Sequence, residues 1–315
     1  MTTAPPAQGV RRHWDSVPEP VRRALAEALG APVVRARTQS GGFSPGVAAR
    51  VTLADGRRAF VKAVSAQANP HTPKFHRAEA RNAAALPESV PAPRLLTTYD
   101  DGTWVALAFE DVAGRQPHVP WRAAELTRVL DAVARLGRTP APPGTRPAVD
   151  RLAENFAGWR RIVDEGRGPG AGLDAWSVRN APRLAELASS WTDFADGDML
   201  AHADLRADNI LLTADDVVFV DWPHAVRAAP WFDLLVMLPC VRAQGGPQPE
   251  RVFSAHPLGR AAEPEGVTRA LAGLAGYFLE QAGRPAPPGL PTLRAFQRAQ
   301  GEAAVAWLRA RLEGG

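Results

Sequence analysis

The segment 200–222, LAHADLRADNILLTADDVVFVDW, constrains the fold more than any other part of the sequence. Two short apolar runs, ILLT and VVFV, flank the polar turn ADD, which predicts an antiparallel hairpin. With ADD as a three-residue turn, the register places Asn209 opposite Asp221. Asp204 lies on the loop just before the hairpin. The pattern therefore predicts that three polar side chains converge at one end of a buried hairpin.

These side chains offer hard oxygen ligands. Carboxylate and amide oxygens suit Mg²⁺ rather than a softer metal, and Mg²⁺ in proteins commonly accompanies phosphate groups. Each residue alone has a structural alternative, because Asp204 and Asn209 can cap a turn and Asp221 can end a strand. Cys240 is the only cysteine, which excludes an intramolecular disulfide and a cysteine-based zinc site. Together the residues predict a magnesium site formed by Asn209 and Asp221.

The length and the element pattern predict two lobes. A chain of 315 residues with 45% hydrophobic content exceeds the size at which one core stops growing. Residues 1–112 contain a short helical pattern over 18–29, alternating runs around turn pairs such as Asp-Gly, and one main helix near 72–86. Residues 113–315 are dominated by helical patterns. We expect an α+β fold with a β-rich N-lobe (1–112) and a helical C-lobe (113–315). The helices expected in the C-lobe span 121–136, 149–163, 173–194, 231–241, 264–282 and 290–312.

The charge pattern argues against nucleic acid and membranes as partners. The formal net charge is +4, but basic and acidic residues are interspersed and form no concentrated basic stripe. The N-terminal stretch lacks an apolar core of signal-peptide length, and no apolar run is long enough to cross a bilayer. We expect a soluble, cytoplasmic protein.

The segment HADLRADN followed by VFVDW resembles the catalytic and metal-binding motifs of the aminoglycoside phosphotransferase (APH) family, which are protein-kinase-like small-molecule kinases. The resemblance implies that Asp204 is the catalytic base and that Asn209 and Asp221 hold Mg²⁺ against the nucleotide phosphates. It also makes His202 an internal brace. Two positions depart from the family pattern: Ala203 stands where Gly is common, a conservative change, and Asp221 leads into Trp-Pro-His.

Lys62 and Glu79 are the candidate phosphate-binding pair. Lys62 lies in AFVKAV on the same predicted strand face as Phe60 and Val64, and a lysine among apolar neighbours needs an anion nearby. The resemblance implies that a helix glutamate holds this lysine, and Glu79 lies on the predicted helix. The alternative is a surface lysine and a solvated glutamate.

The remaining nucleotide-binding candidates lie in a glycine-rich loop and a hinge. Gly41, Gly42 and Ser44 belong to SGGFSPG, which lies between the first two predicted strands and is similar to loops of small-molecule kinases that cover phosphates. The segment AFEDVAG falls where the resemblance places the interlobe hinge, whose backbone would bind the purine. We assign the backbone of Glu110 and Val112 to this hinge, and a solvated loop acid is the alternative for Glu110.

Several other residues have a family role and a structural alternative. Asp233 resembles the helix-start aspartate that supports the catalytic loop, and helix capping is the alternative. Trp222 and Trp231 are expected in the core. His224 is close enough to the motif to line the acceptor pocket, but a structural histidine is the favoured interpretation.

The resemblance implies ATP-dependent phosphorylation of a small-molecule hydroxyl, with Mg²⁺ and with GTP as an alternative donor. Eleven residues separate Asp221 from Asp233, too few for the activation segment of a protein kinase. Residues 241–315 contain nine arginines, six glutamates and no aspartate, which argues mildly against a highly cationic acceptor. Antibiotic resistance or biosynthetic tailoring is expected by family analogy. The rival interpretations are a catalytically silent nucleotide-binding regulator and a basic nucleic-acid-binding module.

Overall fold

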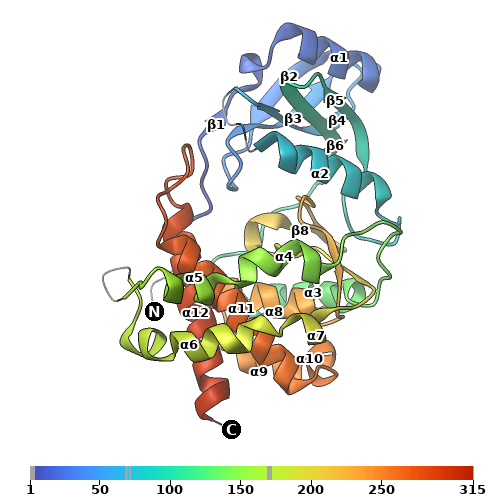
Figure 1. Cartoon of the computed structure of the whole chain (residues 1–315). Coiled ribbons are helices and arrows are strands. Elements are labelled where there is room, and N and C mark those ends of the chain that lie inside the picture. Colours follow the sequence, from blue (N-terminus) through green and yellow to red (C-terminus); the bar gives the residue numbers. More distant parts are fainter. Residues whose placement is uncertain (1–3, 68–69, 71, 169–171, 315) are drawn as a thin grey trace.

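The computed structural model describes residues 4–67, 70, 72–168 and 172–314. A sheet-rich N-lobe sits on a larger helical C-lobe (Figure 1). The predicted α+β, two-lobe fold is therefore confirmed. No helix in these residues is both long enough and apolar enough to cross a membrane.

The N-lobe is built on a six-stranded sheet with the order β1-β3-β4-β6-β5, in which β2 also pairs with β3. Neighbouring strands are antiparallel except β1 and β3, which are parallel. The N-lobe elements are β1 (Arg11–Arg12), η1 (Trp14–Ser16), α1 (Glu19–Leu29), β2 (Val33–Thr38), β3 (Gly46–Leu53), β4 (Arg58–Ser65), α2 (Thr72–Ala85), β5 (Leu95–Asp100) and β6 (Trp104–Glu110).

The two faces of β4 have different partners. Successive side chains of a strand point to opposite faces, so Val61 and Ala63 pack with the apolar residues of α1. Phe60 and Val64 belong to a separate cluster that includes residues of α2. Lys62 shares this second face, which is the face predicted from the alternation. The sheet thus directs one lysine toward α2 and the C-lobe.

The C-lobe packs helices around α11, which lies against α4, α5, α6, α7, α8 and α12. Most residues of α11 and α8 are buried, so these two helices form much of the C-lobe core. The helices are α3 (Ala123–Leu136), α4 (Ala148–Phe156), α5 (Gly158–Asp164), α6 (Ala175–Ser189), α7 (Thr192–Ala195), α8 (Phe232–Ala243), α9 (Pro249–Ala255), α10 (Pro257–Arg260), α11 (Pro264–Ala282) and α12 (Leu293–Glu313), with a 3-10 turn η3 (Ala207–Asn209).

The helices predicted at 149–163 and 173–194 are each interrupted. The first becomes α4 and α5 because Ala157, with ψ of 15°, leaves helical geometry between them. This bend brings Gly158 against Gly276 of α11. The second becomes α6 and α7, separated at Ser190. The short helices α9 and α10 were not predicted, because seven and four residues are too few to show a periodic pattern.

The C-lobe also contains two small antiparallel sheets of two strands each. One pairs β7 (Met199–Ala201) with β10 (Val226–Ala228), and the other pairs β8 (Ile210–Leu212) with β9 (Val217–Phe219). The predicted register of the second pair is wrong by one residue.

Leu212, not Thr213, pairs with Val217. Thr213 donates its backbone N–H to the carbonyl of Asp216, which closes a tighter turn than the predicted three-residue loop. Asn209 consequently lies opposite Val220, whose N–H donates to the Asn209 carbonyl at 2.9 Å.

We expect Gly158→Ala to destabilise the C-lobe. A Cβ at position 158 would lie 2.2 Å from the carbonyl oxygen of Gly276, so α5 and α11 would have to separate. Overpacking of this kind costs about 1–3 kcal/mol in the free energy of unfolding, measurable by urea denaturation. Gly168→Ala is the control, because a Cβ there meets no described atom within 4 Å. Equal stability of the two variants would contradict the close helix crossing.

Candidate active site

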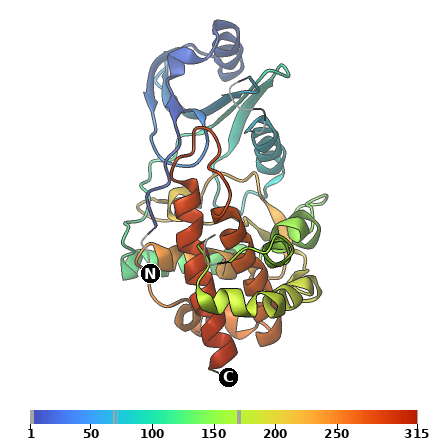
Figure 2. The same ribbon diagram turned by 60° about the vertical axis from the view of Figure 1, so that its left-hand side comes forward.

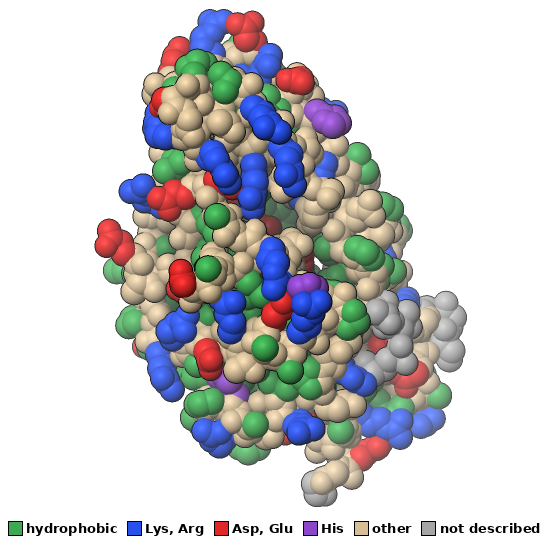
Figure 3. All heavy atoms as spheres, turned by 180° about the vertical axis from the view of Figure 1, so that it is seen from behind, with side chains coloured by type: hydrophobic (Ala, Val, Ile, Leu, Met, Phe, Trp, Pro, Cys, Tyr) green, Lys and Arg blue, Asp and Glu red, His purple; other side chains and the backbone are tan. Residues whose placement is uncertain are grey.

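A cleft that is partly open to solvent lies between the lobes. Figure 3 shows a hollow in the surface at the junction of the lobes, with Lys and Arg side chains gathered on the N-lobe beside it. The cleft is lined by all the residues predicted to bind the nucleotide or the metal: Gly41, Gly42, Ser44, Lys62, Glu79, Glu110, Val112, Asn209 and Asp221. Asp204 lies just outside this lining, with 27% of its side chain exposed.

Lys62 lies between two carboxylates at the centre of the cleft. Its Nζ is 2.6 Å from Oε1 of Glu79 on α2 and 2.9 Å from Oδ1 of Asp221, which follows β9. The side chain of Glu79 is only 4% exposed. The surface lysine and solvated glutamate considered as the alternative are therefore excluded, and Lys62 joins the two lobes.

The three charges shift one another's pKa. Burial alone would raise the pKa of Asp221, but the charge of Lys62 and its hydrogen bond hold that pKa well below its usual range. Burial raises the pKa of Glu79 to about 7, and Lys62 opposes this shift. Burial acts to lower the pKa of Lys62, and the two carboxylates outweigh it, so the net shift is upward. Lys62 and Asp221 thus stay ionised at neutral pH.

Asn209 connects the hairpin to Asp204. Its Nδ2 donates to the backbone carbonyl of Asp204 at 2.8 Å and to the Asp204 carboxylate at 3.2 Å. This fixes the orientation of the amide and leaves its Oδ1 without a donor among the described residues. The amide oxygen is therefore free to act as a ligand in the cleft.

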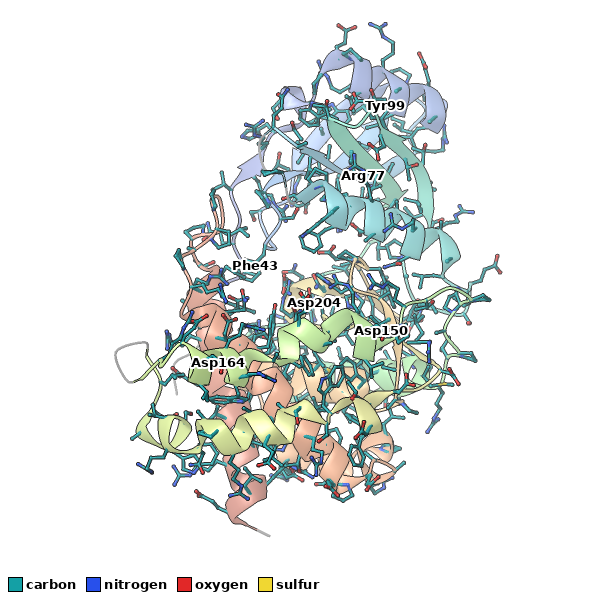
Figure 4. All side chains as sticks on the ribbon, viewed as in Figure 1. Phe43, Arg77, Tyr99, Asp150, Asp164 and Asp204 are labelled. Carbon is teal, nitrogen blue, oxygen red and sulfur yellow. The ribbon has the colours of Figure 1, made fainter. Side chains whose placement is uncertain are left out.

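Arg206 is a site residue that sequence reasoning missed. Its guanidinium forms an ion pair with Asp204 and a second one, at 3.0 Å, with Asp208. It also lies over the rings of Phe43 and Phe296, 5.5 and 5.9 Å from their centroids. In Figure 4 Phe43 extends from the lower edge of the N-lobe, and Asp204 lies at the top of the C-lobe. An arginine flanked by aspartates two residues away on each side was the available signal.

Burial raises the pKa of the Asp204 carboxyl, and the charge of Arg206 opposes that rise. The same two aspartates raise the pKa of Arg206 well above its usual value, despite its burial. The carboxylate of Asp204 is thus held by Arg206 on one oxygen and by Asn209 on the other.

Asp233 supports the loop before Asp204 and does not cap its own helix. Its Oδ2 accepts the N–H of His202 at 2.7 Å, and its Oδ1 accepts the N–H of Ala203 at 2.8 Å. His202 is fully buried; its Nε2 donates to the Val220 carbonyl at 3.0 Å and its Nδ1 accepts the Asp204 N–H at 3.3 Å. Burial lowers the pKa of His202 to about 4, so it is a neutral brace, as expected.

Two residues of the site have left-handed backbone conformations. Ala203 has φ of 61° and Asp221 has φ of 70°, a region that residues with a Cβ rarely adopt. The conformation of Asp221 turns the chain sharply after Val220. It thus brings the Asp221 side chain to Lys62 although the hairpin register differs from the predicted one. The change from Gly to Ala at position 203, expected to be conservative, places an alanine where the backbone favours glycine.

The hinge offers a backbone donor at Val112. The Val112 carbonyl already accepts from Gly114 N–H and from Arg50, whereas its own N–H has no acceptor in the described part of the chain. The carboxylate of Glu110 forms an ion pair with Arg94 at 2.8 Å, so its side chain is engaged elsewhere. The assignment of Glu110 and Val112 to purine binding stays a prediction that concerns their backbone.

A sequence model described as the APH phosphotransferase enzyme family matches residues 35–274, most of the chain and nearly all of the elements that form this cleft. The chain belongs to the APH phosphotransferase family. The prediction of a phosphotransferase enzyme of the small-molecule kinase type is confirmed by this membership. A search of curated proteins found no significant match.

Solved structures share the fold of this APH family member at low sequence identity. A choline/ethanolamine kinase family protein from Mesorhizobium loti is 18% identical over 94% of each chain, with a TM-score of 0.59. Choline kinase LicA from Streptococcus pneumoniae is 12% identical over 91% of this chain and 98% of its own, with a TM-score of 0.58. An aminoglycoside phosphotransferase from Alicyclobacillus acidocaldarius is 16% identical over 90% and 92%, with a TM-score of 0.52.

The donor set in this APH cleft fits Mg²⁺. Among the described residues nothing donates to Asn209 Oδ1, and Asp221 pairs with Lys62 only through its Oδ1, so each residue keeps a hard oxygen that can bind the ion. The described residues contain no group of three or more His, Cys, Asp or Glu side chains that could hold a metal on their own. A metal here would need oxygen ligands from a bound phosphate as well.

Trp222 and Trp231 lie in the core, as expected, whereas His224 lies near Asp204. Trp222 and Trp231 are buried in the C-lobe core, with 2% and 6% exposure. His224 lies against the ring of Phe75 at 5.5 Å, and its Nδ1 is 3.4 Å from Arg151. Burial lowers the pKa of His224, and Asp204 is near enough to oppose that shift. His224 therefore lies close enough to Asp204 for the two side chains to interact electrostatically.

We expect Ala203→Gly to stabilise the protein. Glycine removes the steric cost of φ near 60°, about 1–2 kcal/mol, and part of this gain is offset by greater freedom of the unfolded chain. Thermal denaturation should show an equal or higher midpoint. Ala207→Gly is the control in the same loop and should lower the midpoint, because Ala207 is buried and has no positive φ. A similar loss in both variants would contradict backbone strain at position 203.

Proposed function

We propose that the protein transfers the γ-phosphoryl group of ATP to a hydroxyl group of a small molecule in a magnesium-dependent reaction. In this proposal residues 1–112 bind the nucleotide, and residues 113–315 supply the catalytic loop and the acceptor site. The observation that carries it is the linkage across one cleft: Lys62 contacts Asp221, while Asn209 contacts Asp204. A phosphate-binding cation, a pair of metal ligands and a base are thereby held together.

The proposed reaction forms a bond between the acceptor oxygen and the γ-phosphorus and breaks the bond between that phosphorus and the β,γ-bridging oxygen. ADP leaves with the bridging oxygen, and the hydroxyl proton passes to Asp204. Catalysis of such a transfer is mainly positioning and charge stabilisation. Mg²⁺ bound by Asn209 and Asp221 would neutralise charge on the β- and γ-phosphate oxygens.

The remaining roles follow from the contacts of each residue. Lys62, held in position by its ion pair with Glu79, would bind the phosphates through its ammonium group. Gly41, Gly42 and Ser44 would cover them from the glycine-rich loop.

The hinge supplies the Val112 N–H and the Glu110 backbone for the purine edge. These backbone groups do not discriminate adenine from guanine, so GTP is also compatible with this cleft.

Asp204 is suited to orient an acceptor hydroxyl. Arg206 and Asn209 each occupy one of its oxygens, and an ionised carboxylate can accept further hydrogen bonds at each oxygen. Its orientation is therefore fixed while acceptor capacity remains. The partial exposure of the side chain provides access for a substrate.

The charges around Asp204 favour a neutral or anionic acceptor. Arg206 pairs with it, and His224, which contacts Arg151, interacts with it electrostatically. Burial and Asp204 raise the pKa of the Tyr277 hydroxyl, and the charge of Arg294 opposes that shift. Arginines are thus found close to Asp204 as well as in excess over acidic residues in the segment 241–315. A polycationic substrate would need a pocket lined by carboxylates. A hydroxylated antibiotic or related metabolite of low positive charge is the acceptor class we propose, with resistance or biosynthesis as its biological role.

Asp204→Asn should leave binding of Mg·ATP nearly unchanged and lower turnover by about 10²–10⁴-fold, because the amide cannot accept a proton as the carboxylate does. The assay is ADP release with pools of hydroxylated antibiotics, nucleosides, sugars and amino alcohols. Mass spectrometry of each product should show one added phosphoryl group.

The matched control is Asp215→Asn, which changes an exposed aspartate of the same hairpin and should retain wild-type turnover. Equal turnover of Asp204→Asn and the wild type would exclude Asp204 as the base. Binding of Mg·ATP without turnover in any pool would favour the silent regulator, and absence of nucleotide binding would overturn the kinase proposal.

The pH dependence should report on Asp204. The carboxylate must be deprotonated to accept the hydroxyl, so kcat/KM should fall as the pH falls through its raised pKa, at a higher pH than for an unperturbed aspartate. Arg206 holds that pKa down, so Arg206→Gln should move the acidic limb to higher pH. A pH–rate profile of the two proteins tests this, and an unmoved limb would separate Arg206 from the ionisation of the base.

A further inference from the structure

The N-terminal strap, residues 4–12, connects the C-lobe, at the end of α8, to the N-lobe sheet. Figure 1 shows the chain beginning beside the C-lobe helices and rising along α12 to β1. The N–H of Ala4 donates to the carbonyl of Ala243 at 2.9 Å, and the N–H of Val10 donates to the carbonyl of Gly289 at 2.9 Å. Figure 2 shows the loop between α11 and α12 rising toward the N-lobe beside this segment. The strap is thus anchored on the C-lobe before it reaches the sheet.

The strap then joins the glycine-rich loop. The N–H of Gly42 donates to the carbonyl of Ala7 at 3.1 Å. β1 pairs in parallel with the start of β3, with Arg11 beside Gly46. On the next strand Lys62 lies opposite Ala48. Two cations from different parts of the sequence therefore flank the start of β3, where the glycine-rich loop meets the sheet.

The side chain of Arg11 lines the same cleft as Lys62. Its two terminal nitrogens donate to the carbonyls of Ser44 and Gly41 in the glycine-rich loop. Its Nε is buried and has no hydrogen-bond partner in the described residues. The guanidinium packs so closely on the loop that a Cβ at Gly42 would lie 2.9 Å from its Nη2.

In the described residues no carboxylate forms an ion pair with Arg11, although the negative charges of Asp221 and Asp208 act on it from within the cleft. Burial lowers the pKa of Arg11, which reflects a cation withdrawn from water without a matching anion. Carbonyl oxygens are weaker partners for a guanidinium than phosphate oxygens, which form charge-assisted, bidentate hydrogen bonds.

We propose that Arg11 is a nucleotide-phosphate ligand that the N-terminal strap carries into the cleft. The inference rests on the proposed use of a nucleoside triphosphate. An incoming phosphate chain competes with the Ser44 and Gly41 carbonyls for the guanidinium and supplies the anion that it lacks. Arg11 then contacts the phosphates from the side opposite Lys62, and the N-terminal residues form part of the nucleotide site.

The test is calorimetric titration of the full-length protein with Mg·AMP-PNP and, separately, with adenosine. Arg11→Gln should weaken Mg·AMP-PNP binding by about 10- to 100-fold, the range of a charge-assisted hydrogen bond, and leave adenosine binding unchanged. Arg11→Lys keeps the charge and should bind Mg·AMP-PNP more tightly than Arg11→Gln does. Arg12→Gln is the control, because it removes an exposed charge from the same strand and should bind like the wild type.

Each other result overturns the proposal. Unchanged Mg·AMP-PNP binding in Arg11→Gln would exclude a phosphate contact. An equal loss for adenosine would show that Arg11 only supports the shape of the cleft. Glutamine can still donate to the loop carbonyls, so a Gln variant that binds as well as or better than the Lys variant would make Arg11 a brace of the loop. Wild-type protein that does not bind Mg·AMP-PNP would instead remove the proposed function, and the inference with it.

Discussion

The position of Lys62 between Glu79 and Asp221 determines how the rest of the cleft is arranged. A buried ammonium is costly unless carboxylates surround it, so α2 and the segment after β9 must both approach β4. Glu79 keeps the lysine in place from within the N-lobe. Asp221 shares only one oxygen with it, so the other stays open toward the cleft. One interaction therefore links the sheet, the helix and the C-lobe and leaves a ligand oxygen available.

The catalytic-loop geometry is maintained against local strain. Ala203 and Asp221 adopt left-handed conformations, which persist in proteins only where the surroundings hold them. Asp233 holds the loop at Ala203, because its two carboxylate oxygens accept the backbone N–H groups of His202 and Ala203. At Asp221 the ion pair with Lys62 fixes the side chain. Burial raises the pKa of Asp233 to about 6, so it is mainly ionised at neutral pH, the state in which both oxygens can accept. The strained positions thus lie next to the proposed base and a proposed metal ligand.

Sequence patterns predicted the parts of the site that depend on periodicity and motif. The face of Lys62 followed from strand alternation, and its pairing with Glu79 followed from the family resemblance, which implies a helix glutamate as the partner. The hairpin register was wrong because turn length is not encoded in the apolar pattern, yet Asp221 still reaches the cleft through its unusual φ. Arg11 was missed because its role arises from contacts between segments distant in sequence. Arg206 had a local signal, an aspartate two residues away on each side, but its contacts with Phe43 and Phe296 join distant segments. Arginines are frequent in this chain, so their number carried no signal.

Three kinds of contact hold the lobes together around the cleft. Lys62 bridges to Asp221, Phe43 of the glycine-rich loop packs on Phe296 of α12 at 5.0 Å, and the strap ends on the C-lobe. Opening the lobes would have to break a partly buried ion pair, an aromatic contact and backbone hydrogen bonds together. The groups proposed to bind phosphate are consequently held in a fixed relation to the Asp204 loop before a ligand arrives. Such preorganisation reduces the reorganisation required during phosphoryl transfer, which is the main contribution a protein makes to this chemistry.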